Sequence, residues 1–294
     1  MTSYIESKDL VKVFKLGPVE VQALRGLSIQ IDKGEMVAVI GPSGSGKTTL
    51  LNIIGGLTHA TAGQTWVAGQ EITNASSAQL GMLRQKVVGH IFQTLNLIPT
   101  LTAYENVELP MLAINMPAAQ RKKRVTDLLT TVGLELRMKH KPDELSGGEK
   151  QRVAIASALA NDPPIIICDE PTGDLDQETG AMVVQFLHRV NKEMGKTIVM
   201  VTHDPAIARQ TDRIYRIMDG TIISVQKPSE SEEANAAMRV DMYRDRLNET
   251  QLELDDLERT YKEQRINAET FAERWHNLSE TKKFLERELH RMGL

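Results

Sequence analysis

The residues from Gly41 to Thr49 have the types and spacing needed to hold a chain of phosphates. They read Gly-Pro-Ser-Gly-Ser-Gly-Lys-Thr-Thr and fit the pattern G-x-x-x-x-G-K-[ST]. In such a loop the glycines let successive backbone N–H groups point at one spot. The lysine reaches the β- and γ-phosphates, and the hydroxyl after it holds Mg²⁺. The sequence therefore predicts a nucleotide site made by Gly41, Pro42, Ser43, Gly44, Ser45, Gly46, Lys47, Thr48 and Thr49.

The segments on either side of this loop are those that the motif requires. Residues 35–40 form a short apolar run typical of a buried strand, and residues 49–54 are typical of the first turns of a helix. A chance glycine-rich turn is the alternative, and it would occur on the order of once in a hundred chains of this length. The strand–loop–helix context favours the nucleotide site, because the loop would then lie at a helix N-terminus.

A second chemical signal is the segment Ile165–Glu170, an apolar strand that ends in two acids. Buried charge at the end of such a strand needs a cation or a ligand. Beside the phosphate loop, Asp169 is predicted to hold Mg²⁺ through water, and Glu170 to polarise the attacking water. The alternative is a strand that simply leaves the core into solvent. Cys168 is interpreted as a core residue without a catalytic role.

A second anion-binding turn is predicted at Ser146, Gly147 and Gly148, which precede another helix. Ser146 would cap that helix and also donate to an anion. Taken alone, the segment is better explained as a capped turn. One nucleotide needs only one such cradle, however, so two cradles in one chain indicate a pair of subunits.

Together these motifs resemble the ATP-binding cassette ATPases over roughly residues 4–226. The resemblance implies a head-to-tail homodimer, with each ATP between the phosphate loop of one subunit and the signature loop (residues 145–152) of the other. It implies that Gln93 contacts Mg²⁺ and the attacking water and senses a membrane partner. It further implies that Asp176 lies at the subunit seam and that His203 contacts the γ-phosphate. Phe14 matches the adenine-stacking aromatic residue, usually tyrosine; by itself it would be interpreted as a core residue.

Three segments, residues 53–57, 92–110 and 171–176, resemble the MacB/LolD group of these ATPases. The resemblance implies an ATP-hydrolysing subunit that drives a separate transmembrane permease, for efflux, lipoprotein release or mechanical work. It would sit at the cytoplasmic face of the inner membrane. The cell-division ATPase FtsE is similar, so a regulator of an envelope hydrolase that moves no substrate is an alternative. A soluble cassette ATPase acting on nucleic acid or ribosomes is a third hypothesis. That class often carries two cassettes or a coiled coil within the cassette, and neither is found here.

The bulk composition excludes several other classes of protein. The 294 residues are 41% apolar and carry a net charge of −4, which does not suggest nucleic acid as a partner. One cysteine excludes an internal disulfide and a thiolate metal site, and the seven histidines lack metal-ligand spacing. We expect no secretory signal and no membrane span, and hence a chain that is soluble by itself.

The expected fold class is α/β: a P-loop NTPase with an antiparallel β edge and a helical subdomain at about residues 94–160. An antiparallel start is predicted from residues 5–14 and 21–31. Further predicted strands are 65–67, 87–92, 165–169, 197–201, 213–218 and 221–225. Helices are predicted at 118–132, 148–159 and 177–194. A composition change near residue 228 divides the chain into a module at 1–228 and an acidic, helical module at 229–294.

The second module repeats apolar residues at 3,4-spacing from Val240 to Met292, which predicts a coiled coil of about eight heptads. Asn267 is a suitable N-cap, so two antiparallel helices turning near residues 265–267 are favoured over one rod of about 80 Å. Large aromatic residues in this tail are typical of interfaces. We therefore expect the tail to hold two ATPase subunits together or to bind an additional protein. The alternative is a helix that folds back on its own ATPase domain.

Overall fold

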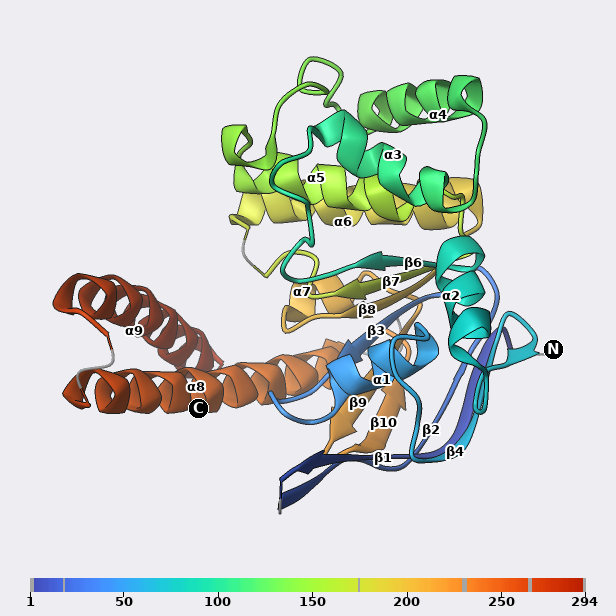
Figure 1. Ribbon diagram of the computed structural model, residues 1–294. Coiled ribbons are helices and arrows are strands. Elements are labelled where there is room, and N and C mark those ends of the chain that lie inside the picture. The colour runs from blue at the N-terminus through green and yellow to red at the C-terminus, as the bar shows by residue number, and fades with distance from the viewer. Residues whose placement is uncertain (1–2, 18, 174, 229–231, 264–265, 293–294) are drawn as a thin grey trace.

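The computed structural model describes residues 3–17, 19–173, 175–228, 232–263 and 266–292 (Figure 1). It contains two sheets, a group of helices above one of them, and a helical hairpin that projects to one side. The strands are β1 (Ile5–Leu16), β2 (Val19–Ile31), β3 (Met36–Ile40), β4 (Ala62–Val67), β5 (Gln70–Glu71), β6 (Val88–Ile91), β7 (Ile165–Asp169), β8 (Thr197–Val201), β9 (Arg213–Met218) and β10 (Thr221–Gln226). The helices are α1 (Lys47–Ile54), α2 (Ser77–Lys86), α3 (Ala103–Ala113), α4 (Ala118–Thr131), α5 (Gly147–Ala158), α6 (Gln177–Met194), α7 (Pro205–Ala208), α8 (Glu232–Lys262) and α9 (Ala268–Arg291), with a 3₁₀ turn at Pro142–Glu144.

The central sheet has the strand order β10-β9-β3-β8-β7-β6, and its pairs from β9 to β6 are parallel. Its strands are apolar at successive positions because both faces are covered. In β7, Ile165 and Ile167 pack in the cluster that contains α1, whereas Ile166 and Cys168 pack in the cluster that contains α5 and α6. The period of two along the strand therefore places α1 and α5 on opposite faces of this sheet (Figure 1).

A second, antiparallel sheet has the order β2-β1-β4-β5 and lies below the central one in Figure 1. The helices α3, α4 and α5 form the predicted helical subdomain, and α3 contacts both of the others. Thr102 caps α3 through a reciprocal pair of hydrogen bonds with Glu105. The fold is thus the α/β class expected from the sequence, with the predicted antiparallel edge and helical subdomain.

The tail folds as the predicted helical hairpin, in which α8 and α9 pack against each other. Asn267 caps α9 by accepting from the Thr270 N–H at 2.8 Å, and the rings of Tyr261 and Phe271 stack at 4.3 Å near the turn. Arg265, within the predicted turn, lies outside the described residues. Leu257 and Leu285 are buried in the tail. The regular coiled coil stays a prediction.

The part of α8 around Met242 packs against the ATPase fold itself, which is the arrangement that the sequence analysis treated as the alternative. Met242 is buried in a cluster with Ala38, Ile40 and Ile214.

Within the described residues, no helix is both long enough and apolar enough to cross a bilayer.

A partly buried histidine in the central sheet gives a testable pH dependence. Burial, aided by the positive charge of Arg84, lowers the pKa of His90 to about 4. The unfolded chain takes up this proton near pH 6.5, so it binds more protons than the folded state between these two values. The free energy of unfolding should therefore fall as the pH decreases from 6.5 to 4, by about 3 kcal/mol at most. Denaturant unfolding of the wild type and His90→Gln at pH 6.5 and 4.5 measures this, and equal losses in both proteins would contradict it.

Candidate functional site

The phosphate loop connects the end of β3 to α1, as the motif requires. Its bends use backbone angles that favour glycine, with φ of 149° at Gly41 and 103° at Gly46. Space excludes side chains as well: a Cβ at Gly41 would lie 2.0 Å from Ile217 O, and one at Gly46 would lie 2.5 Å from Ala23 O. The loop is therefore held close to neighbouring backbone, with its N–H groups at the start of α1.

Two polar side chains inside the loop suit a bound anion. Lys47 is 6% exposed, and its ammonium donates to Gly41 O at 2.7 Å and Pro42 O at 2.8 Å. Ser45 Oγ is buried and has no hydrogen-bond partner among the described residues. Within the described part of the chain, the hydrogen bonds of the Lys47 ammonium go to neutral carbonyls and the Ser45 hydroxyl has no partner. Both features fit a site whose phosphates supply further acceptors.

The two acids at the end of β7 lie beside this loop. The Thr48 hydroxyl donates to Asp169 Oδ1 at 3.3 Å. Gln93 Nε2 donates to one oxygen of Glu170 at 3.3 Å, and His203 Nε2 donates to the other at 2.5 Å. The structure thus brings together five side chains that are separated along the chain but were predicted to act at one site.

The backbone at Glu170 adopts a strained conformation. Its φ is 48°, in the left-handed region that non-glycine residues seldom adopt. Its N–H donates to Val201 O at 3.1 Å on the neighbouring strand β8, which holds this conformation in place. Strained conformations of this kind cluster at active sites and ligand-binding regions, which agrees with the role predicted for Glu170.

The environment separates the proton affinities of the two acids. Burial raises the pKa of Asp169, and the charge of Glu170 adds to this effect. Burial alone would also raise the pKa of Glu170, but the hydrogen bond and charge of His203, with the charge of Lys47, outweigh it and lower the pKa. Glu170 is therefore ionised at neutral pH, the form that can accept a proton from water.

The signature residues lie apart from this cluster, as a second group. Ser146 caps α5 by accepting from the Glu149 N–H at 3.3 Å. Asp176 caps α6 through Thr179, and a Cβ at Gly148 would lie 2.3 Å from Cγ2 of the same Thr179. The first turns of α5 and α6 are therefore in close contact. Both helices cover the face of the central sheet opposite α1 (Figure 1).

Phe14 on β1 is 39% exposed, with the ammonium of Lys12 over its ring at 5.0 Å. It is not a core residue, so the core interpretation of Phe14 is wrong.

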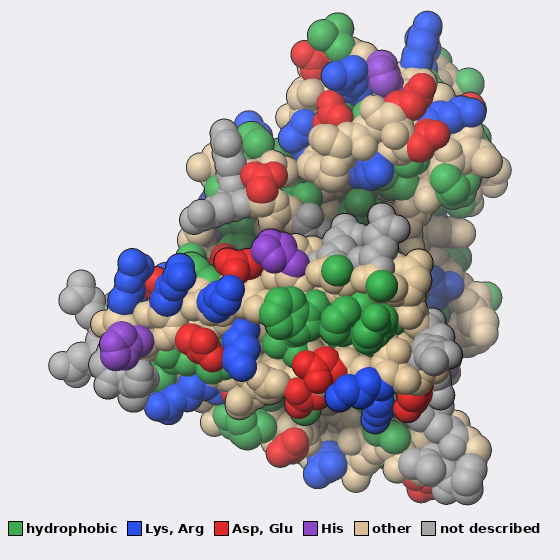
Figure 2. Space-filling view, turned by 90° about the vertical axis from the view of Figure 1, so that its left-hand side faces the viewer, with side chains coloured by type: hydrophobic (Ala, Val, Ile, Leu, Met, Phe, Trp, Pro, Cys, Tyr) green, Lys and Arg blue, Asp and Glu red, His purple; other side chains and the backbone are tan. Residues whose placement is uncertain are grey.

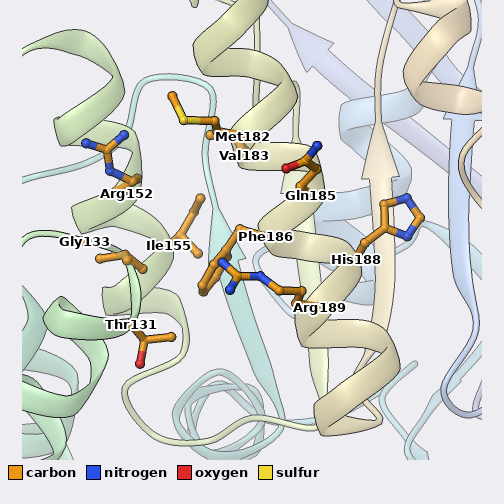
Figure 3. A pocket seen from close by; sticks show the side chains of 11 residues that line it. Thr131, Gly133, Arg152, Ile155, Met182, Val183, Gln185, Phe186, His188 and Arg189 are labelled. Atoms are coloured by element: carbon orange, nitrogen blue, oxygen red, sulfur yellow. The ribbon is translucent and has the colours of Figure 1, made fainter.

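A cavity of about 940 Å³ lies between α5, α6 and the end of α4, where Arg189 covers the ring of Phe186 (Figure 3). It is lined by none of the predicted ATP-binding residues and is distinct from the phosphate loop.

One residue at the phosphate loop was missed by the sequence analysis. Glu249 on α8 accepts a hydrogen bond from the Ser43 N–H, and it is 7% exposed. Nothing in its local sequence distinguishes Glu249 from the other acids of the tail.

Comparison with known proteins decides the family. A family model described as "ABC transporter" matches residues 24–173. The chain belongs to the ABC transporter family. It is 44% identical over 237 residues to the macrolide export ATP-binding/permease protein MacB of Shigella flexneri, covering 81% of this chain and 36% of MacB. It is 41% identical over 221 residues to the lipoprotein-releasing system ATP-binding protein LolD of Alcanivorax borkumensis, covering 75% and 97% of the two chains.

A solved structure extends the similarity to the fold. It is a dimeric post-hydrolysis state of the ATP-binding cassette MJ0796, from Methanocaldococcus jannaschii, bound to ADP and Pi. The TM-score is 0.72 at 42% identity, and the match covers 77% of this chain and 100% of the other. The resemblance inferred from the motifs is confirmed: the protein is an ATP-binding cassette that binds and hydrolyses ATP.

Proposed function

We propose that this ABC ATPase works as a homodimer that powers a separate membrane permease of the MacB/LolD type. The observation that carries the proposal is the placement of its two half-sites. Lys47 and Thr48 begin α1 on one face of the central sheet, whereas α5, the helix that Ser146 caps, packs on the opposite face. Because one chain does not bring the two groups together, a second copy must supply the signature loop.

The roles proposed for the site follow from its contacts. The phosphate loop binds the triphosphate through its N–H groups and Lys47, and Phe14 stacks on the adenine. Glu170 accepts a proton from the attacking water, while His203 and Gln93 hold its carboxylate in position. Ser146, Gly147 and Gly148 bind the nucleotide of the partner subunit, and Asp176 lies at the seam between subunits.

Mg²⁺ fits the oxygen-rich corner at Thr48 and Asp169, whose oxygens lie 3.3 Å apart. Among the described residues, no three His, Cys, Asp or Glu side chains are grouped closely enough to hold a metal ion by themselves. Thr48, Gln93 and Asp169 would therefore hold the ion together with phosphate oxygens and water. When bound, it would neutralise charge on the phosphates.

We also propose that residues 1–228 form an ATPase domain and residues 229–294 a tail. We further propose that the permease holds the protein peripherally at the cytoplasmic face of the inner membrane. The names of the relatives MacB and LolD describe macrolide export and lipoprotein release, which supports transport over the regulation of an envelope hydrolase. Purification from membranes tests this point: a co-purifying permease is the expected result, and a chain that never associates with a membrane protein contradicts it.

A subunit-mixing experiment tests the shared site. Lys47→Ala removes the phosphate-loop lysine, and Ser146→Arg blocks the signature loop. Each variant alone should lack ATPase activity, because both of its sites are defective. In a mixture, half of the dimers are mixed and each of these has one intact site, so activity of up to about a quarter of the wild-type value should return. A mixture as inactive as its parts would argue against a site shared between subunits.

A further inference from the structure

The helix α8 places a carboxylate in the phosphate loop of its own chain. Glu249 accepts from the Ser43 N–H, one of the loop donors predicted to bind nucleotide. A carboxylate that accepts from an N–H of the phosphate loop presents the same charged oxygen acceptor as a phosphate group. Glu249 is 7% exposed, so its charge has been largely removed from water and depends on the partners it finds in the loop.

The same carboxylate acts on the lysine that would serve the phosphates. Burial lowers the pKa of Lys47, and the negative charge of Glu249, ahead of that of Glu170, opposes this effect. Arg246, one turn earlier on α8, pairs with Glu249 at 3.1 Å. Its positive charge also contributes to the low pKa of Glu170. The contact of Glu249 with Ser43 thus places the helix α8 against the phosphate loop.

Contacts outside the site hold α8 in this position. Arg216 on β9, 12% exposed in its side chain, pairs with Asp241 at 2.7 Å and with Asp245 at 3.0 Å. Met242 fills an apolar hollow beside Ala38 and Ile40 of β3. Figure 1 shows this part of α8 beside α1, while the rest projects outward with α9.

The helical hairpin also carries large apolar side chains that are exposed. Leu252 is 68% exposed, Trp275 43% and Phe284 54%. Figure 2 shows hydrophobic side chains gathered among charged ones on the side from which the hairpin projects. The docked half of α8 is thus joined to a projecting half that is accessible in this arrangement.

We propose that α8 is an autoinhibitory segment: Glu249 occupies the anion site of the phosphate loop and must leave before the phosphates of ATP can bind. The proposal rests on the nucleotide site proposed above. The docked helix and ATP are mutually exclusive at the Ser43 N–H, so each weakens the binding of the other by the same factor.

The first test measures the affinity of the full-length chain for ATP in equilibrium binding. Glu249→Gln keeps the shape of the side chain but removes its charge, and Glu249→Ala removes the acceptor as well. We expect both to bind ATP about tenfold more tightly than the wild type, the value of one charge-assisted hydrogen bond. Glu253→Gln is the matched control, because Glu253 is the other acid paired with Arg246, at 3.5 Å, and is half-exposed. It should bind within about twofold of the wild type.

Failure of this inference is distinguishable from failure of the nucleotide site. If the Glu249 variants bind ATP as the wild type does while Lys47→Ala loses binding, the site stands and α8 does not inhibit it. If Lys47→Ala also binds ATP normally, the phosphate loop is not the nucleotide site and both proposals fall.

Hydrogen exchange of the wild type gives an independent readout. With saturating Mg-ATP, the amides of residues 241–257 should exchange faster; unchanged protection would mean that α8 stays docked and would overturn the proposal.

Discussion

Glu170→Gln should bind ATP but hydrolyse it at least about a hundredfold more slowly than the wild type, the scale of a lost general base. The amide keeps the size of the side chain and can still contact Gln93 and His203, but it cannot accept a proton from water. Steady-state phosphate release at saturating ATP measures the loss in turnover. Equilibrium ATP binding of the same variant shows whether the site remains intact.

The matched control for this variant is Glu193→Gln, an exposed acid on α6 remote from the site residues. It should leave both turnover and binding near the wild-type values. If Glu170→Gln kept normal turnover, its assignment as the residue that activates water would be wrong, and Asp169 would be the next acid to test.

Lys47→Ala should weaken ATP binding by about ten- to a hundredfold, because it removes the buried ammonium that would face the phosphates. The loss should be smaller for AMP, which lacks the β- and γ-phosphates that this lysine is predicted to reach. Comparing the dissociation constants of ATP and AMP for the wild type and the variant separates a phosphate contact from a general loss of structure.

Lys192→Ala is the control for Lys47→Ala. Lys192 pairs with Asp212 at 3.0 Å on the surface, and such exposed pairs contribute little to stability. We expect it to bind both nucleotides normally. Equal weakening of ATP and AMP by Lys47→Ala would contradict the assignment of Lys47 to the terminal phosphates.

The family fold and most of the site could be predicted from the sequence because their signals are local. The loop from Gly41 to Thr48 works through backbone geometry within one turn, so its spacing is visible in the chain. Asp169 and Glu170 follow the buried strand β7 directly, and parallel strands bring the carboxyl ends of β7 and β3 to the same edge of the sheet, with β8 between them. The helical hairpin was also predictable, since Asn267 is a strong local cap.

The tertiary structure alone decided where the tail lies and what it touches. Ser43 and Glu249 are 206 residues apart, and their contact depends on how α8 docks on β9 and β3. Docking of a long helix is set by distant packing and ion pairs, such as those of Arg216, and the 3,4-spacing of its own residues does not specify it. The sequence by itself therefore determined an ABC ATPase with a helical tail, and only the folded chain placed a carboxylate of that tail in the phosphate loop.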